Sequence, residues 1–247
     1  MGYKLWTMPD RRSIAQDVAG RLRSLILQGA YKPGEKLPPE RRLAEALKVN
    51  RATLREALKN LEQAGLVRIR QGDGTRVQNF LHTAGLDILA HLLHLGEDTA
   101  ASILKDIMEF RQIIGREIAR LAAERGKAEQ LVRLEAIAVR ETTTQEEALV
   151  QDLDFYIELA RASQNVVFIL ILNPVGEAVR RFSGVFANFN LSVEEVHGHH
   201  AEVIEAIRAR NPEAAHQAAD LHLHLGKEHL LSLLDRSGVE VLARPPE

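Results

Sequence analysis

Two neighbouring helical patterns in the N-terminal third constrain the fold of this chain more than any other feature. The first covers residues 37–44 and the second residues 49–58, with a tight polar turn between them. Pro39 suits the first turn of a helix, because the N–H that proline lacks would be unpaired there. Asn50 is a favourable N-cap for the second helix. Two short helices joined in this way predict a helix-turn-helix.

The residues on either side extend this pattern to a winged helix. Ser13, followed by Gln16, predicts a capping box at the start of an earlier helix, which ends at Gly29. After the second helix of the pair, apolar and polar residues alternate over 67–70, as in a strand. A glycine-rich turn follows, and a second short strand pattern covers 75–77. Together these patterns indicate a hairpin. The hairpin is expected to turn three basic side chains outward: Arg68, Arg70 and Arg76.

The second helix of the pair begins with groups that suit nucleic acid. Arg51 and Arg55 lie one turn apart, beside Asn50 and Thr53. A helix N-terminus presents N–H groups to anions, whereas two arginines there oppose the helix dipole unless an anionic partner is present. An isolated arginine pair would more often be a solvated face. The adjoining basic hairpin favours DNA binding here.

The charge of the chain is divided unevenly along its length. Residues 1–79 contain 16 Lys and Arg against 8 Asp and Glu, whereas residues 80–247 contain 16 against 26. The basic part suits phosphate neutralisation and the acidic part does not. Two domains with different partners are therefore expected.

The composition narrows the class of protein. An apolar fraction of 45% supports a buried core, and the absence of cysteine excludes disulfides and thiolate chemistry. No apolar run approaches the roughly 20 residues of a membrane span, and the N-terminus lacks a signal-peptide pattern. We therefore expect a cytoplasmic protein with no membrane partner.

The C-terminal two thirds have a helical pattern from Leu86 to near Leu234. Repeated Leu, Ile and Ala at helical spacing predict an antiparallel bundle. The expected fold is mainly α, with an N-terminal winged helix-turn-helix that includes a small β-hairpin, followed by this bundle. The expected domains are a DNA-binding domain at 10–78, a linker at 79–85 and an effector-binding and dimerisation domain at 86–235. The candidate helices are 86–95, 99–125, 128–147, 149–162, 165–187, 193–210 and 212–234.

The N-terminal motif resembles the GntR family of bacterial transcription regulators, specifically its FadR subfamily. The resemblance rests on residues 34–41, 43–44, 50–58, 61, 65–66 and 72–75. It implies a DNA-binding set made of Arg41, Asn50, Arg51, Thr53, Arg55, Gln71 and Gly72. Among these, Arg51 is the best candidate for guanine, because a bidentate arginine suits the O6/N7 edge. Gln71 and Gly72 would place the wing tip in the minor groove.

The C-terminal region resembles the helical effector domain of the same subfamily, through residues 109–111, 160–165 and 204–207 among others. Many relatives bind a divalent metal through one Asp and three His. Here Asp152, His200 and His222 match three of those positions, and Tyr156 stands at the fourth. Zn and Ni favour imidazole over a phenol. The alternatives are therefore a three-ligand Zn or Ni site completed by water and a site that requires no cofactor.

Other residues resemble a fatty-acid-responsive branch of the subfamily. They are 79–80, 83–89, 170–173 and 186–188. In that branch the effector domain is metal-free and binds long-chain acyl-CoA, and Tyr156 fits this pattern. Arg111 stands where the family directs an arginine toward an acidic effector. An ion pair between Arg111 and a neighbouring acid is the alternative.

The leading hypothesis is a homodimeric repressor or activator that binds a palindromic operator and responds to a small acidic effector, with long-chain acyl-CoA of fatty acid metabolism as the first candidate. The alternative effectors are a metal-assisted carboxylate, such as an organic or sugar acid, or the metal itself. A metal-dependent enzyme using Asp152, His200 and His222 is the remote alternative. No catalytic residues are expected, because no nucleophile or general-base motif accompanies them and the winged helix would be unexplained.

Overall fold

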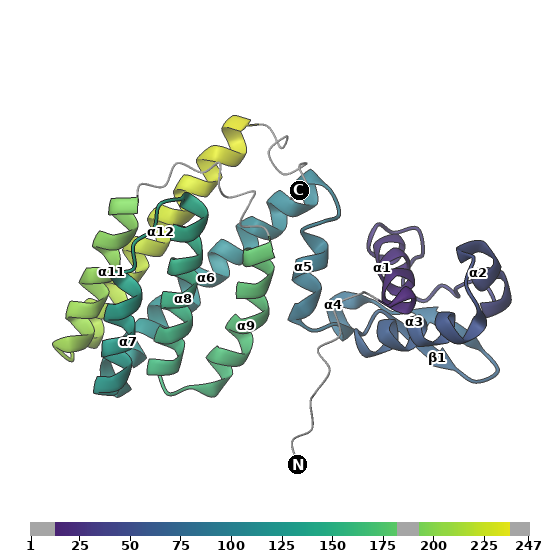
Figure 1. Cartoon of the computed structure of the whole chain (residues 1–247), viewed down its shortest axis with the longest axis horizontal. Coiled ribbons are helices and arrows are strands. Elements are labelled where there is room, and N and C mark those ends of the chain that lie inside the picture. Colours follow the sequence, from purple (N-terminus) through teal and green to yellow (C-terminus); the bar gives the residue numbers. More distant parts are fainter. Residues whose placement is uncertain (1–12, 182–192, 238–247) are drawn as a thin grey trace, which may run out of the picture. The chain divides into compact units, whose positions relative to one another are not determined.

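A computed structural model describes residues 13–181 and 193–237 of the chain (Figure 1). The chain divides into two compact units, which meet between Ile88 and Leu89. The predicted domain bounds of 10–78, 79–85 and 86–235 remain predictions. Part of the fatty-acid-like pattern, residues 186–188, lies outside the described residues.

The first unit is a three-helix winged helix. Its elements are α1 (Ile14–Leu27), α2 (Glu40–Leu47), α3 (Arg51–Gln63), β1 (Val67–Arg70), β2 (Gly74–Val77), the short α4 (Phe80–Thr83) and the 3-10 turn η1 (Leu86–Ile88). Helices α1 and α2 both pack on α3. Strands β1 and β2 pair antiparallel, with Val67 opposite Val77. The predicted fold class is confirmed in this unit.

Local capping sets the starts of two of these helices. Ser13 and Gln16 form the predicted capping box before α1. The Asn50 side-chain oxygen accepts from the Thr53 N–H at 2.8 Å and caps α3, also as predicted. Leu54, Leu58 and Leu61 of α3 are fully buried and form the centre of this unit's core.

A glycine at the end of α3 allows the chain to turn close to α4. Gly65 has φ +72°, and a Cβ there would overlap the backbone carbonyl of Thr83. The Thr83 hydroxyl donates to the Gly65 carbonyl at 2.6 Å, which holds the two segments together. Residue 65 therefore requires glycine both for its backbone conformation and for space.

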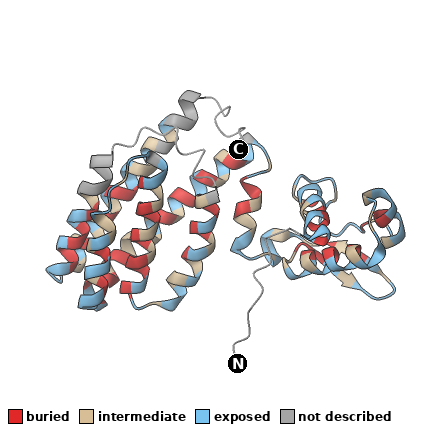
Figure 2. Cartoon of the chain, viewed as in Figure 1, coloured by how far each residue is buried: buried red, intermediate tan, exposed pale blue. Residues whose placement is uncertain are grey.

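The second unit is a helical bundle (Figure 1). It contains α5 (Leu89–Leu92), α6 (Glu97–Arg125), α7 (Ala128–Ala138), α8 (Gln145–Ala162), α9 (Val166–Arg181), α11 (Val193–Arg208) and α12 (Pro212–Ser237). Helices α6 and α12 pack along each other, and α8 contacts α6, α7, α9 and α11. Buried residues face the interior of the bundle (Figure 2). The predicted helical bundle is confirmed, and no strand occurs among the described residues of this unit.

The structure moves the break between the predicted helices 128–147 and 149–162 toward the N-terminus. Helix α7 ends at Ala138, and Thr144 caps α8 by accepting from the Glu147 N–H. The side-chain amide of Gln151 donates to the carbonyls of Ile137 and Arg140, which replaces helical bonds at the end of α7. The sequence prediction misplaced this break because its position depends on a contact with the next helix.

None of the helices in the described part of the chain is long and apolar enough to cross a membrane.

We expect Gly65→Ala to destabilise the chain by about 2–4 kcal/mol, because strain from the left-handed backbone adds to the overlap with Thr83. Gly29→Ala is the matched control: Gly29 has φ +81°, but no atom lies within 4 Å of its Cβ position. The Gly29→Ala control should lower the free energy of unfolding by only about 1 kcal/mol. Equal losses for the two variants in denaturant unfolding would contradict the packing role of Gly65.

Candidate DNA-binding face and effector site

The N-terminal end of α3 presents the predicted DNA-binding groups. Arg51 is the first residue of the helix and Arg55 follows one turn later, and both are exposed. The Asn50 oxygen is occupied as the cap, which leaves its amide nitrogen as a donor. Arg51 makes no ion pair or side-chain hydrogen bond to any other described residue. This end of the helix is therefore free to meet an anionic partner.

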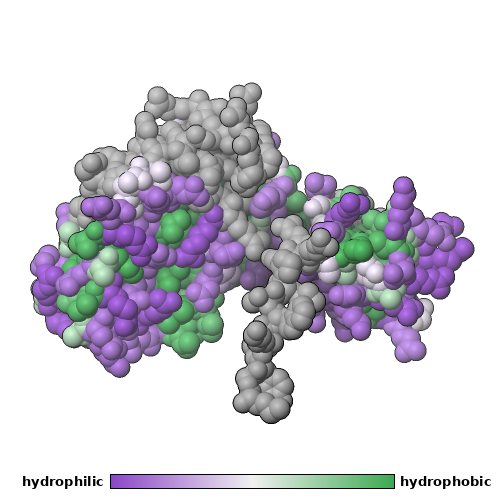
Figure 3. All heavy atoms as spheres, viewed as in Figure 1, coloured by the Kyte–Doolittle hydropathy of each residue, from purple (hydrophilic) through white to green (hydrophobic). Residues whose placement is uncertain are grey.

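The other two predicted arginines have carboxylate neighbours. Arg55 Nε donates to Glu40 Oε2 at 2.8 Å. Arg41 lies 3.8 Å from Glu45 on the same helix, which is too long for a hydrogen bond. The surface over α2 is mainly hydrophilic (Figure 3). These contacts leave the terminal nitrogens of Arg55 available to DNA.

The tip of the wing is exposed, as its predicted role requires. Gln71 and Gly72 are exposed, and Gly72 has φ +80°. Next to them, Asp73 pairs with Lys36 and with Arg76 at 2.8 Å. Hydrogen bonds from Arg76 and Lys36 hold the pKa of the Asp73 carboxyl well below its ordinary value.

The three basic side chains of the wing lie on its outward side, as predicted. Arg68 and Arg70 are exposed, and Arg76 lies between the buried Thr75 and Val77 with a side chain that is 40% exposed. Arg76 differs from the other two because it bonds to Asp73 and donates to the Gly34 carbonyl at 3.0 Å. A carboxylate three residues away and a carbonyl 42 residues away thus satisfy its guanidinium within the unit.

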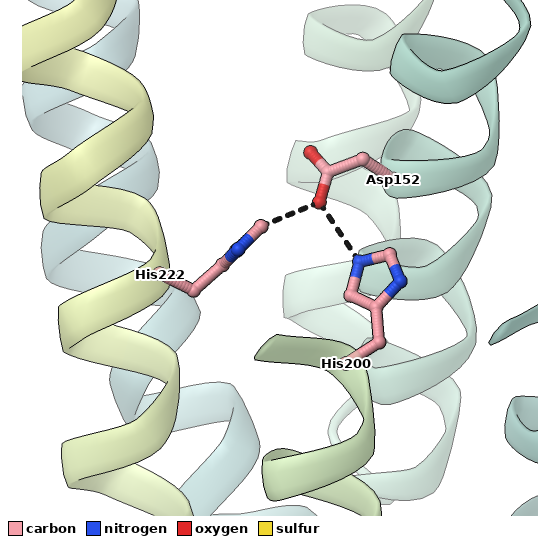
Figure 4. Close-up of side chains that lie close together, drawn as sticks. All are labelled: Asp152, His200 and His222. Atoms are coloured by element: carbon pink, nitrogen blue, oxygen red, sulfur yellow. Dashed lines mark hydrogen bonds and ion pairs between the residues drawn. The ribbon is translucent and has the colours of Figure 1, made fainter. Parts of the chain in front are cut away.

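A buried carboxylate at the centre of the bundle brings together the predicted effector-site residues (Figure 4). Asp152 of α8 accepts from Arg111 of α6 at 2.5 Å through Oδ2. Its Oδ1 is 3.1 Å from Nε2 of His200 on α11 and 2.8 Å from Nε2 of His222 on α12. Because an ionised carboxylate only accepts, each Nε2 carries a hydrogen in this arrangement.

Opposing effects set the charge of Asp152. Burial raises its pKa, but the positive charge of Arg111 and the contacts with His222 and His200 outweigh burial and hold the pKa well below its ordinary value. Asp152 is therefore ionised at neutral pH. The alternative of an ion pair for Arg111, left open by the sequence, is the arrangement found.

Tyr156 lies one turn after Asp152 and completes the cluster. The Arg111 guanidinium lies 5.6 Å from the centre of its ring, and the His222 ring stacks at 5.8 Å. Its hydroxyl is buried and has no hydrogen-bond partner among the described residues. Burial and the charge of Asp152 raise the Tyr156 pKa well above its ordinary value, so the phenol keeps its proton. Tyr156 is thus a buried donor without an acceptor.

Gly115 of α6 makes room for this tyrosine, and the sequence analysis did not identify it. A Cβ at residue 115 would overlap a methyl group of Leu223 and lie 3.1 Å from Tyr156 Cε1. Gly115 follows Arg111 by four residues, so both face the same side of α6. The sequence shows this spacing, but it does not show that Tyr156 of another helix packs against residue 115.

Asp152, His200 and His222 carry donor atoms of the kind that a divalent metal takes. Ligand atoms of Asp152, His200 and His222 all lie within 4.8 Å of one another. Two imidazoles and a carboxylate are a known ligand set that leaves positions open. Tyr156 stands at the fourth position, where a phenol is a poorer ligand for Zn or Ni than an imidazole. His200 Nδ1 also has no partner among the described residues, so the usual second hydrogen bond of a metal-bound imidazole is missing. The residues fit a cation with three protein ligands.

A winged helix joined to a helical bundle with a buried polar cluster defines a DNA-binding regulator with an effector domain. Residues 14–77 match the family described as "Bacterial regulatory proteins, gntR family", and residues 106–225 match the FCD domain. The chain belongs to the GntR family of bacterial transcription regulators and carries an FCD domain. The resemblance predicted from the sequence is confirmed.

The relatives are regulators rather than enzymes. The chain is 34% identical over 227 residues to the HTH-type transcriptional regulator Mce2R of Mycobacterium tuberculosis, covering 91% of this chain and 94% of the relative. It is 35% identical over 150 residues to the fatty acid metabolism regulator protein of Shewanella halifaxensis, covering 60% of this chain and 62% of the relative. A solved structure titled for Lar of Listeria monocytogenes shares the fold, with a TM-score of 0.60 and 19% identity. The match covers 91% of this chain and 100% of that chain.

We expect Arg51→Ala to lower specific operator binding by about 1–3 kcal/mol and to relax base preference at one position in each half-site. The control is Lys59→Ala, two turns further along α3, which should weaken binding to all sequences alike. Fluorescence anisotropy with an operator selected from random duplexes measures both effects. Unchanged operator affinity in Arg51→Ala would rule out its assigned role.

Proposed function

We propose that this chain is a homodimeric transcription regulator whose operator affinity is controlled by a small acidic effector bound at the buried cluster of the bundle. The observation that carries the proposal is the buried hydroxyl of Tyr156, which has no acceptor among the described residues. The Arg111 guanidinium lies 5.6 Å from the centre of the same ring. A buried donor without a partner is costly, so this position favours a ligand that accepts hydrogen bonds.

The remaining hydrogen-bonding capacity of the cluster suits a carboxylate. Arg111 gives one terminal nitrogen to Asp152, while its other terminal nitrogen lies 3.8 Å from the weak acceptor Met108 Sδ. The guanidinium therefore keeps strong donors in reserve, and Tyr156 adds one more. An acid placed between Arg111 and Tyr156 would satisfy donors that the protein itself leaves unmatched.

The polar character of the cluster supports a small organic or sugar acid. Five of its side chains carry polar or charged groups: Arg111, Asp152, Tyr156, His200 and His222. A small acid would use these polar groups over its whole surface, whereas a long acyl chain would have to lie along the apolar side chains around them, such as Phe155, which stacks on His200 at 4.0 Å. The resemblance to a fatty-acid-responsive branch still predicts acyl-CoA, and an effector panel that includes it tests the two against each other.

The cluster joins helices that an effector would move. Asp152 connects α8 to α6, α11 and α12 through Arg111, His200 and His222. An incoming carboxylate that binds the unused donors of Arg111 would weaken the pair between Arg111 and Asp152 and so change the packing of these helices. We infer that this change alters the spacing of the two α3 helices of the dimer on a palindromic operator.

A second candidate is metal-assisted effector binding, favoured by the three ligand atoms within 4.8 Å. Asp152, His200 and His222 would hold the cation, which would supply a positive charge for a carboxylate oxygen of the effector. Arg111 and Tyr156 would then orient the rest of that acid. If metal is required, a chelator abolishes the response of operator affinity to the acid.

We expect Tyr156→Phe to weaken effector binding at least about tenfold, because a hydrogen bond to a charged group is worth about 1.5–3 kcal/mol. Stability should stay unchanged or rise slightly, since the variant removes an unpaired buried hydroxyl. Citrate, gluconate, glycolate and oleoyl-CoA are titrated against wild type and variant by calorimetry, and unfolding is followed in parallel.

The control is Tyr31→Phe, a half-buried tyrosine of the first unit, which should leave effector binding unchanged. A wild-type protein that binds none of these acids, or a Tyr156→Phe variant that binds its acid as tightly as wild type, would contradict the assignment.

The metal alternative has its own test in Tyr156→His. This variant supplies a third imidazole, and so a fourth ligand, beside Asp152 and should raise the affinity for Zn²⁺ at least about tenfold over wild type. Competition with a metal indicator dye measures this affinity. An unchanged affinity would show that residue 156 does not face the cation.

A further inference from the structure

A carboxylate lies beside the helix expected to read DNA. Glu40 is the first residue of α2, and its Oε2 accepts from Arg55 Nε of α3 at 2.8 Å. The Glu40 side chain is 35% exposed and that of Arg55 is 66% exposed. An exposed carboxylate close to DNA repels phosphates. The Glu40 carboxylate therefore weakens the attraction to DNA and must have another role at this position.

Two structural roles of Glu40 are available, and neither involves DNA. An acidic residue in the first turn of α2 interacts favourably with the helix dipole. The exposed ion pair with Arg55 would add little to stability. Both roles predict that removing the carboxylate strengthens binding to every DNA sequence, because only repulsion is lost.

The atoms in the contact indicate a more specific role. A guanidinium is planar, and its Nε lies on a different edge from the pair of terminal nitrogens. The bond from Nε to Glu40 restrains the plane and leaves Nη1 and Nη2 as a paired edge. That paired edge matches O6 and N7 of guanine.

Neither of the other two predicted arginines is held in this way. Arg51 has no carboxylate partner among the described residues, and Arg41 is 3.8 Å from Glu45, beyond hydrogen-bonding distance. Arg55 is thus the arginine of this set whose orientation is fixed before DNA arrives.

We propose that Glu40 is a positioning residue for Arg55 and that the pair reads a guanine in the major groove. The inference rests on DNA binding through α3 and not on the effector. With Glu40 present, Arg55 loses less rotamer freedom on binding guanine than an unrestrained arginine does. Without it, Arg55 contacts phosphates as readily as a base, so sequence preference falls while general affinity remains.

The experiment compares five variants with wild type on an operator selected from random duplexes. Glu40→Ala removes the acceptor, and Glu40→Gln keeps an acceptor oxygen but removes the charge. Glu45→Ala is the matched control, because it removes a carboxylate from the same helix without breaking a hydrogen bond. Arg55→Ala is made alone and combined with Glu40→Ala. Affinities are measured for the operator, for each single base-pair change and for an unrelated duplex.

We expect Glu40→Ala to lose about fivefold or more in operator affinity and to lose discrimination at one guanine in each half-site. Affinity for the unrelated duplex should stay constant or rise. Glu40→Gln should keep most of the discrimination, and Glu45→Ala should keep all of it. In the Arg55→Ala background, Glu40→Ala should cause no further loss of discrimination.

Two results would overturn the positioning role. One is an equal gain in affinity for operator and unrelated DNA in Glu40→Ala, as simple repulsion predicts. The other is an undiminished effect of Glu40→Ala when Arg55 is absent. Thermal unfolding of each variant verifies folding, and Glu40→Gln provides the comparison if Glu40→Ala is unstable. Failure of wild type to select any sequence would contradict operator binding itself rather than the Glu40–Arg55 pair.

Discussion

The buried carboxylate of Asp152 is the interaction on which the second unit depends. It accepts from Arg111, His200 and His222, and so joins α8 to three other helices. Taking a charge out of water is costly unless it is paired and hydrogen-bonded, and here both oxygens are occupied. Removing one partner of such a buried pair typically costs about 3–5 kcal/mol. A ligand that competes for Arg111 therefore acts on the contact that holds the bundle's interior together.

Carboxylates orient arginines in both units, with different consequences. In the bundle, Asp152 holds Arg111 in a buried site. The pairing is strong there, so an acid that competes for Arg111 has a large energetic effect. On the DNA-binding face, Glu40 holds Arg55 near solvent, where the pair adds little stability but sets the direction of the guanidinium. The first arrangement suits a response to a ligand, and the second suits recognition of a fixed sequence.

Local signals predicted much of the fold, and tertiary contacts explain what they missed. Ser13 and Asn50 cap helices as predicted, because capping involves residues three positions apart. The position of the break between α7 and α8 depends on Gln151 reaching the end of the previous helix, which no periodicity reveals. In the site, family resemblance identified Asp152, His200 and His222. The unpaired hydroxyl of Tyr156 and the space made by Gly115 became visible only when helices distant in sequence were packed.

The central claim is that the cluster around Asp152 and the DNA-binding face are thermodynamically coupled. The most direct test measures operator affinity with and without a saturating acid, and acid affinity with and without saturating operator, for the same protein preparation. Linkage requires the two affinity ratios to be equal. The account predicts equal ratios of at least about fivefold. A ratio of one in both directions, with the acid bound at the cluster, would contradict it.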